Sequence, residues 1–548
     1  MPRQLTPLAA AALLVPIALP AAADASNTAT GDVRASGGPI SGTQPDPFET
    51  GQIFIGFSDA GRYAVSSGSV TTASSVSIGA SLGDSFGLLE VSGVGSRLST
   101  DEVDLNAGEI DINFGGELDL SGSLSLGRPS NPVVRLDARG AGTRVAAFSI
   151  DASNGDVTVR DGATLTSANS IFLTLGSQVS VVGSGSTAFA AGLDFVVSNH
   201  TRVDAIDGGQ VRATNRINVN DQGLLRLQGG TLAASSVVLA PSPIVGFPQS
   251  PTLRGGGDVI VASRLLVDTV GFVEIGSSEE LRVIASEPSG GNLSLLNGGR
   301  LNSDGGALSI GGTFGINESL ATFQNASVRA GQIVVGDDVG AGGAMTFLGG
   351  LSDVQGDILI EAAGRVAVAP DARATFFDDY VNQGVTTVSE RAMAVFLGSV
   401  SGSGSFDGGG EVVILGDLLP GNSPAAVGFG GDLTLGDDAL TVMELGGLTR
   451  GDEYDALLVT DVFTADGTLE IALIDGFVPA AGDAFDLFDF ATFAGSFDQI
   501  LLPDLPDGLS FDTRQLPTLG LVTVVPEPAG LAALAPANLL LMRRRYRR

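Results

Sequence analysis

The sequence contains no cysteine, no lysine and no tryptophan, and its only histidine is His200. Without cysteine there is no disulfide, no zinc–thiolate site and no thiol nucleophile. Without lysine there is no Schiff base and no phosphate-binding lysine of the P-loop type. One histidine cannot build the two- or three-histidine metal sites of catalytic zinc enzymes. A Ser-His-Asp triad would have to use His200, which we interpret instead as a surface or turn residue.

Acidic residues outnumber basic ones by 61 to 28, so the formal net charge is −33. Such a surface repels nucleic acid and anionic lipid, so we expect no nucleic-acid partner. We predict no cofactor, and only weak binding of Ca²⁺ to scattered carboxylates. The hydrophobic fraction of 43% and the mean hydropathy of +0.31 are too high for a disordered chain. With 78 glycines, the composition favours many short strands joined by tight turns.

Two short patterns recur through the middle of the chain. One is a strand followed by a glycine, any residue, a second glycine and then a serine or threonine. The first glycine of this pattern is Gly93, Gly140 or Gly183 in its three copies. These glycines are 47 and 43 residues apart, which corresponds to about two coils each. The second pattern is two small residues, a polar residue and an aliphatic one, as in Gly208-Gly209-Gln210-Val211. Aliphatic and polar residues alternate around these turns, which is the signal of a half-buried strand.

A coil of about 20 residues cannot bury its apolar side alone and must stack on its neighbours. We therefore predict an all-β protein whose residues 50–415 form a parallel, right-handed β-helix, or β-solenoid. Residues 1–25 are expected to be a signal peptide, residues 26–49 a linker, and residues 416–525 a small antiparallel β module that caps the rod. Residues 526–548 are expected to be a sorting signal with a short hydrophobic helix. Seven phenylalanines of the C-terminal module are interpreted as core: Phe477, Phe485, Phe488, Phe490, Phe493, Phe497 and Phe511.

Parallel β-helices include polysaccharide lyases and hydrolases, whose chemistry needs clustered carboxylates or a base next to a metal. The adjacent acids here are Asp337-Asp338, Asp378-Asp379 and Asp437-Asp438. Neighbours along a strand point to opposite faces, so such a pair is not one carboxylate cluster. We interpret these acids as solvated turn residues and predict neither a catalytic residue nor a metal site.

Both ends of the chain have the composition of targeting signals, which we call address signals below. Arg3 precedes the apolar residues 5–20, and Ala21, Ala23 and Ala25 offer small-x-small cleavage sites, as in a secretory signal peptide. At the other end, Val525-Pro526-Glu527-Pro528 precedes an apolar stretch at residues 529–542. That stretch has 14 residues, fewer than the ~20 that span a bilayer. A basic cluster follows it: Arg543, Arg544, Arg545, Arg547 and Arg548.

The C-terminal arrangement resembles the PEP-CTERM sorting signal of Gram-negative bacteria that secrete polysaccharide. In that family an exosortase-type membrane protease is thought to cut near the Pro-Glu-Pro motif. The resemblance implies a transient inner-membrane anchor, followed by release to the cell surface or the extracellular space. The glycine-containing repeats are similar to those of autotransporter passengers and PEP-CTERM proteins, which are associated with surface and adhesive roles.

The leading hypothesis is an exported, non-enzymatic β-solenoid of the cell surface or extracellular matrix. Its expected partners are an exosortase-type protease and extracellular polysaccharide or cell-surface glycans. A polysaccharide lyase or glycoside hydrolase on the same scaffold is the alternative. A purely structural spacer, which assembles at the surface without binding glycans, is a third hypothesis.

Overall fold

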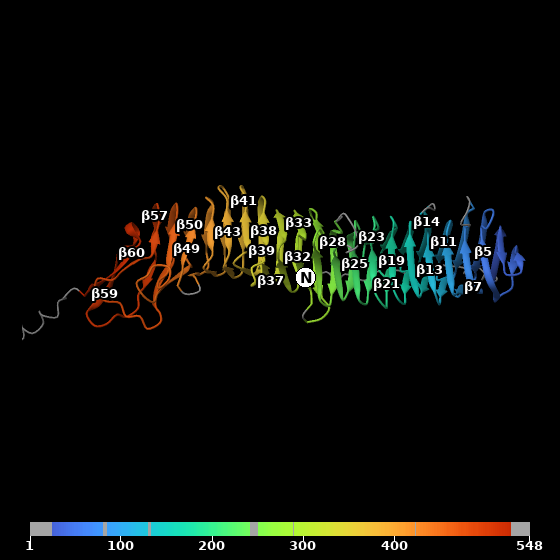
Figure 1. The fold of residues 1–548 in the computed structure, drawn as a ribbon, viewed down its shortest axis with the longest axis horizontal. Coiled ribbons are helices and arrows are strands. Elements are labelled where there is room, and N and C mark those ends of the chain that lie inside the picture. Colours follow the sequence, from blue (N-terminus) through green and yellow to red (C-terminus); the bar gives the residue numbers. More distant parts are fainter. Residues whose placement is uncertain are drawn as a thin grey trace, which may run out of the picture.

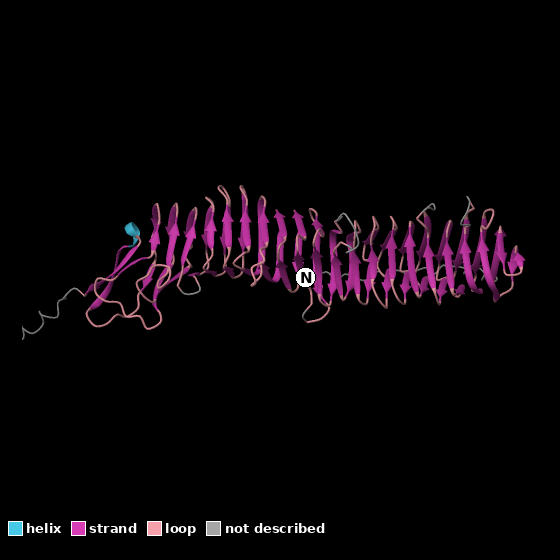
Figure 2. Cartoon of the chain, viewed as in Figure 1, coloured by secondary structure: helices cyan, strands magenta, loops and turns pink. Residues whose placement is uncertain are grey.

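The chain forms a rod of stacked β-strands (Figure 1). The computed structural model describes residues 25–79, 85–129, 133–241, 250–288, 290–421 and 424–527. Strands make up 61% of the structure and helix only 1%. Figure 2 shows the one short helix of the described residues, α1 (Leu516–Leu519), at the C-terminal end of the rod. The predicted all-β parallel solenoid is confirmed.

Each turn of the solenoid contains three strand segments, and each segment pairs in parallel with the corresponding segment of the next turn, which in most coils is the third strand that follows. Leu89 lies beside Ile110, and Ile110 lies beside Leu136, one coil further along the rod at each step. The coils differ in length: a short one leads from Ala394 to its neighbour Val412, and a long one from Leu457 to Phe488. The pairings define three long parallel faces that run the length of the rod.

The first face contains β6 (Gly61–Ser66), β8 (Gly87–Ser92), β11 (Gly108–Asn113), β14 (Val134–Arg139), β17 (Gly155–Arg160), β20 (Gln178–Val182), β23 (Arg202–Ile206), β30 (Phe272–Ile275), β33 (Arg300–Asp304), β36 (Leu320–Gln324), β38 (Ala344–Phe347), β40 (Arg365–Val368), β43 (Val385–Val388), β46 (Ser405–Asp407), β49 (Ala426–Phe429), β52 (Ala456–Val459) and β56 (Phe488–Asp489). The second face contains β9 (Arg97–Thr100), β12 (Glu117–Leu120), β15 (Arg144–Ala147), β18 (Thr164–Ser167), β21 (Thr187–Ala190), β24 (Gln210–Ala213), β31 (Glu280–Ala285), β34 (Ala307–Ile310), β41 (Ala372–Phe376), β44 (Met393–Phe396), β47 (Glu411–Ile414), β50 (Asp432–Leu435), β53 (Val462–Ala465) and β57 (Thr492–Gly495).

The third face contains β10 (Glu102–Leu105), β13 (Ser123–Leu126), β16 (Ser149–Ser153), β19 (Ile171–Thr174), β22 (Phe195–Val197), β25 (Arg216–Val219), β27 (Ser236–Leu239), β29 (Arg264–Asp268), β32 (Asn292–Leu296), β35 (Thr313–Ile316), β42 (Tyr380–Asn382), β45 (Val400–Gly402), β48 (Leu418–Pro420), β51 (Leu440–Leu445), β54 (Thr468–Leu473) and β58 (Gln499–Leu501). Six longer strands pass a corner and belong to two faces: β5 (Phe48–Ile55), β7 (Val70–Ile78), β26 (Leu224–Ala234), β28 (Thr252–Val261), β37 (Ser327–Val335) and β39 (Gly350–Ile360).

The interior is a continuous column of side chains that alternate with outward polar ones. In β8 the inward residues Leu89 and Val91 are fully buried, whereas Leu88 and Glu90, which alternate with them along the strand, are half-buried. Toward the C-terminal half the column becomes aromatic: the rings of Phe376 and Phe396 stack at 5.0 Å. Offset or edge-on aromatic pairs add stability beyond the area that they bury.

Glycine at the corners lets successive coils approach closely. Gly208 has a φ of +86°, which lies in the left-handed region that favours glycine. A Cβ on Gly209 would lie 2.1 Å from the carbonyl oxygen of Val181 in the preceding coil. The small-small-polar-aliphatic pattern thus marks a corner of the coil. Its aliphatic residue, here Val211, is the first buried residue of the strand that follows the corner.

The expected linker at residues 26–49 is instead the N-terminal cap of the rod. The strand β1 (Ser26–Gly31) pairs antiparallel with β6, and β2 (Val33–Ala35) pairs antiparallel with β5. Two further short strands, β3 (Gly38–Pro39) and β4 (Gly42–Gln44), complete the cap. Backbone pairing with the first coil needs no apolar side chains, so a polar segment of this kind can form a cap. The cap covers strand edges that would otherwise be free to pair with another chain.

A buried polar network fixes this cap to the first coil. Asn27 accepts hydrogen bonds from the hydroxyls of Thr71 and Ser69, at 2.8 and 3.1 Å. The Tyr63 hydroxyl lies 2.9 Å from the Thr71 hydroxyl, and burial raises the pKa of Tyr63 to about 12. All four side chains are fully buried.

The solenoid also extends further toward the C-terminus than residue 415. Parallel pairing continues to β58, so most of the module expected to be antiparallel consists of further coils. From Val427 onward the coils are long, and Val427 itself lies beside Leu457. These longer coils hide the period in the sequence, and alternation alone does not distinguish parallel from antiparallel strands.

The antiparallel part is a three-stranded sheet of β55 (Ala484–Asp486), β60 (Leu521–Pro526) and β59 (Leu509–Gln515). It lies beside the last coils at the red end of the rod (Figure 1). Phe485 and Phe488 are buried there, and the other five phenylalanines of the set predicted to be core are half-buried and pack against the core.

Candidate functional sites on the faces and at the C-terminal end

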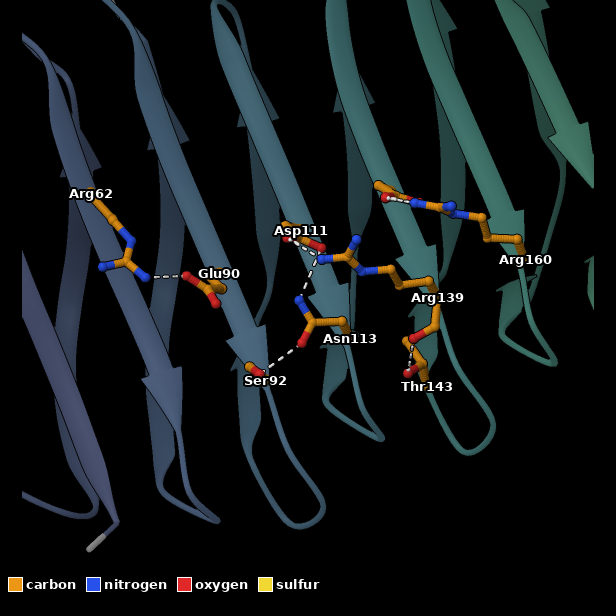
Figure 3. A network of polar contacts seen from close by, with 9 residues as sticks. Arg62, Glu90, Ser92, Asp111, Asn113, Arg139, Thr143 and Arg160 are labelled. Carbon is orange, nitrogen blue, oxygen red and sulfur yellow. Dashed lines mark hydrogen bonds and ion pairs between the residues drawn. The ribbon is translucent and has the colours of Figure 1, made fainter. Parts of the chain in front are cut away.

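Charged residues on the first face pair across neighbouring coils near the N-terminal end (Figure 3). Arg62 pairs with Glu90, Arg139 with Asp111 at 3.3 Å, and Arg160 with Asp137 at 2.8 Å. The hydrogen bond from Arg160 to Asp137 raises the pKa of the guanidinium. The arginine side chains are 38% to 48% exposed, so each pair contributes at most about 1 kcal/mol. We interpret this ladder as a connection between coils, because its charges are mutually neutralised.

Buried hydroxyls at one corner of the coil form hydrogen bonds to the preceding coil. Ser96 donates to the carbonyl of Ser92 at 2.7 Å and accepts from the N–H of Gly68 at 2.9 Å. The same arrangement recurs at Thr143, which accepts from Gly115 at 3.0 Å, and at Ser186, which accepts from Gly162 at 3.0 Å. These hydroxyl residues end the glycine-x-glycine repeats. The sequence contained this signal, but their role was not predicted.

The paired acids serve as turn caps. The Asp337 carboxylate accepts from the N–H groups of Val339 and Ala341, at 3.2 and 2.6 Å. Asp378 accepts from Gly356 at 2.7 Å, and Asp379 accepts from Ser399 at 3.1 Å.

The third acid pair has a simpler setting. Asp437 and Asp438 lie exposed in a turn. Among the described residues, no three or more His, Cys, Asp or Glu side chains gather closely enough to hold a metal ion.

His200 lies in a turn, as expected. Its φ is +65°, next to Asn199 at +53°, and the side chain is exposed. Left-handed conformations of this kind occur mostly in turns.

Asp455 is the buried carboxylate with the most perturbed pKa. It is 0% exposed, and burial raises its pKa to about 6, although two N–H groups oppose the shift. Those groups belong to Ala425, at 2.7 Å, and Glu444, at 2.8 Å. Perturbed carboxylates often mark active sites. Here the carboxylate joins three chain segments in the interior, which is a structural role.

The first residues of the predicted sorting motif lie at the end of the last strand. Val525 pairs with Ser510 and Pro526 with Leu509, and the N–H of Glu527 donates to the Gly508 carbonyl at 2.8 Å. Val525 is half-buried, whereas Pro526 and Glu527 are exposed. The rest of the predicted signal lies outside the described residues: Pro528, Arg543, Arg544, Arg545, Arg547 and Arg548.

The predicted signal-cleavage region lies at the other boundary of the folded body. Ala25 is exposed and directly precedes β1, whereas Ala21 and Ala23 lie outside the described residues. In the part of the chain that the structure describes, no helix is both long and apolar enough to cross a membrane. The apolar residues 529–542, expected as a transient anchor, are not in that part.

No family model matches this chain, and no curated protein matches it. The fold defines the class: a parallel β-solenoid with three strands per turn and an antiparallel cap at each end.

Proposed function

We propose that this protein is an exported, non-enzymatic rod of the cell surface or extracellular matrix, associated with extracellular polysaccharide. In this proposal a signal peptidase cuts near Ala25. An exosortase-type protease then cuts near Pro526-Glu527-Pro528, after the C-terminal segment has held the chain briefly in the inner membrane.

The observation that carries the proposal is the position of the folded body between the two address signals. The first strand begins at Ser26, directly after the small-residue cleavage region, and the last strand ends at Pro526. Cleavage after Ala25 and at any bond after Pro526 would leave every strand of both caps whole. The exposure of Pro526 and Glu527 in the folded protein supports access of a protease to this part of the predicted motif.

The use of the carboxylates supports a binding or structural role over catalysis. Asp337, Asp378 and Asp379 accept hydrogen bonds from backbone N–H groups, and Asp111 and Asp137 pair with arginines. A glycosidase instead needs two carboxyl groups that face one substrate across a few ångströms.

Incubation of the purified protein with polysaccharides tests this function. We expect the protein to sediment with the exopolysaccharide of its own organism without changing it. Release of reducing ends or of unsaturated uronic acid would overturn the proposal in favour of a hydrolase or a lyase. Surface assembly without any glycan binding would favour the spacer hypothesis.

A further inference from the structure

The pattern of charges on the first face changes between β33 and β40. In the coils nearer the N-terminus, most of its arginines pair with acids. Within the described part of the chain, Arg300 on β33 and Arg365 on β40 have no ion pair and no side-chain hydrogen bond. Both side chains are exposed. Arg135 and Arg226 on this face also lack an ion pair, but each lies beside an acidic residue of a neighbouring strand. The strand neighbours of Arg300 and Arg365 are all uncharged.

These two arginines belong to one outward row. Arg300 lies beside Leu320, Leu320 beside Ala344, and Ala344 beside Arg365. Three steps between neighbouring strands separate the arginines by about 14 Å. The row therefore presents two cations with an apolar stretch between them.

The adjacent row on the same strands is polar but carries no charge. Asn302 lies beside Thr322, Thr322 beside Thr346, and Thr346 beside Ala367. An amide and two hydroxyls thus run parallel to the row of arginines. In the preceding coils the same row carries Arg254 and Glu274, which pair with each other.

A shallow hollow of about 380 Å³ lies between the arginines. Its lining includes Arg300, Arg365, Leu320, Glu318 and Ser319. Ser319 is only 8% exposed and its hydroxyl oxygen is closed to solvent, so the open part of the hollow is formed by the two arginines, Leu320, Glu318 and the small residues around Ala344. Glu318 is the one carboxylate among the residues that line this hollow.

We propose that the face formed by β33, β36, β38 and β40 binds an acidic polysaccharide through its uronate carboxylates. The inference rests on the proposed function and names the ligand class and its site. The planar guanidinium groups of Arg300 and Arg365 bind carboxylates with two parallel hydrogen bonds. Leu320 and Ala344 contact the C–H faces of sugar rings, and Thr322 and Thr346 bind their hydroxyls.

The test compares full-length variants for binding to polygalacturonate, a uronate polymer, at about 0.15 M ionic strength, where salt screens the repulsion between the polymer and the acidic remainder of the protein. Arg300→Ala combined with Arg365→Ala should weaken binding roughly tenfold, or by about 1.4 kcal/mol, because it removes both exposed charge-assisted contacts. Arg160→Ala combined with Arg391→Ala is the matched control, since it removes the same charge from arginines that pair with Asp137 and Asp371. The control should bind within twofold of the wild type. The arginines of residues 543–548 are present in every variant and cannot produce the difference.

One single variant sharpens the test. Glu318→Gln should strengthen binding, because it removes the negative charge from the hollow. Added salt should reduce the difference between the wild type and the double variant, because it screens exposed charges.

The outcomes separate this inference from the function on which it rests. Equal binding by the wild type and the Arg300/Arg365 variant would overturn this site but leave polysaccharide binding intact. Binding to neutral dextran and not to polygalacturonate would do the same, and so would binding to dextran sulfate alone. No binding to any of the three polymers would overturn the site and count against the proposed function as well.

Discussion

The hydroxyl of Ser96 accepts a hydrogen bond from the backbone N–H of Gly68, 28 residues earlier and one coil away, at 2.9 Å. The same hydroxyl donates to the carbonyl of Ser92 within its own turn. One buried side chain therefore satisfies backbone groups of two coils at once. Because unsatisfied buried polar groups cost free energy, this contact fixes the position of each turn on the one before it.

Ser186→Ala should lower the free energy of unfolding by about 1–3 kcal/mol, because it leaves the Gly162 N–H and the Val182 carbonyl without their side-chain partner. The amide of Gly162 should also lose protection from hydrogen exchange. Ser184→Ala in the same turn is the control, because Ser184 is exposed. Equal exchange rates in the two variants would contradict this role for the hydroxyl.

Gly108→Ala should destabilise the N-terminal coils by about 2–4 kcal/mol. Gly108 has a φ of +133°, and a Cβ there would lie 2.0 Å from the carbonyl oxygen of Gly87 in the preceding coil. Gly428→Ala has nothing within 4 Å of the added Cβ and should leave the midpoint of denaturant unfolding almost unchanged. A Gly108→Ala variant as stable as the Gly428→Ala variant would show that the coils can move apart.

The C-terminal coils should become less stable as the pH rises from about 4 to about 6. The pKa of Asp455 is raised from 3.8 to about 6, so in this range the folded state holds a proton that the unfolded state releases. Folding therefore loses up to about 3 kcal/mol as the pH rises, and the loss is complete above the folded pKa.

Thermal unfolding of the wild type and of Asp455→Asn between pH 4 and pH 8 measures this effect. The difference between their midpoints should change below about pH 6 and remain constant above it. Comparing the two proteins cancels the contribution of the other carboxylates. A constant difference across the whole range would show that Asp455 does not titrate as its burial implies.

Deletion of residues 26–44 should make the rod self-associate. The deletion removes β1 and β2, and thereby exposes the edges of β6 and β5, which are able to pair with other chains. Light scattering coupled to size-exclusion chromatography should show oligomers that grow with concentration. Asn27→Ala, which keeps the strands but loses the hydrogen bonds to Thr71 and Ser69, should stay monomeric with a lower melting temperature. A monomeric deletion variant would mean that the cap does not protect the edge.

The glycine turns and the alternation of aliphatic residues were enough to predict the solenoid. The spacing of Gly93 and Gly140 also predicted two coils per interval correctly, because Leu89, Ile110 and Leu136 occupy successive coils. The alternation of apolar and polar residues indicates which side chains point inward, and it does so regardless of which strand lies alongside. The stacked coils could therefore be predicted from the local sequence pattern alone.

The N-terminal cap and the arginine face could not be predicted in the same way. The N-terminal cap is polar and forms through backbone pairing, which leaves no hydrophobic pattern. The alignment of Arg300 with Arg365 depends on the lengths of the coils between them, and the coil from Leu320 to Ala344 is longer than those on either side. Because the length varies from coil to coil, the sequence does not show which outward residues become neighbours.

Mass spectrometry of the intact protein recovered from the outside of the producing cells tests the central claim most directly. The account predicts a chain that starts close to Ser26 and stops between Pro526 and Pro528, so that the whole folded body remains and both address signals are absent. Recovery of a chain that still carries Arg548, or a chain found only inside the cells, would contradict it.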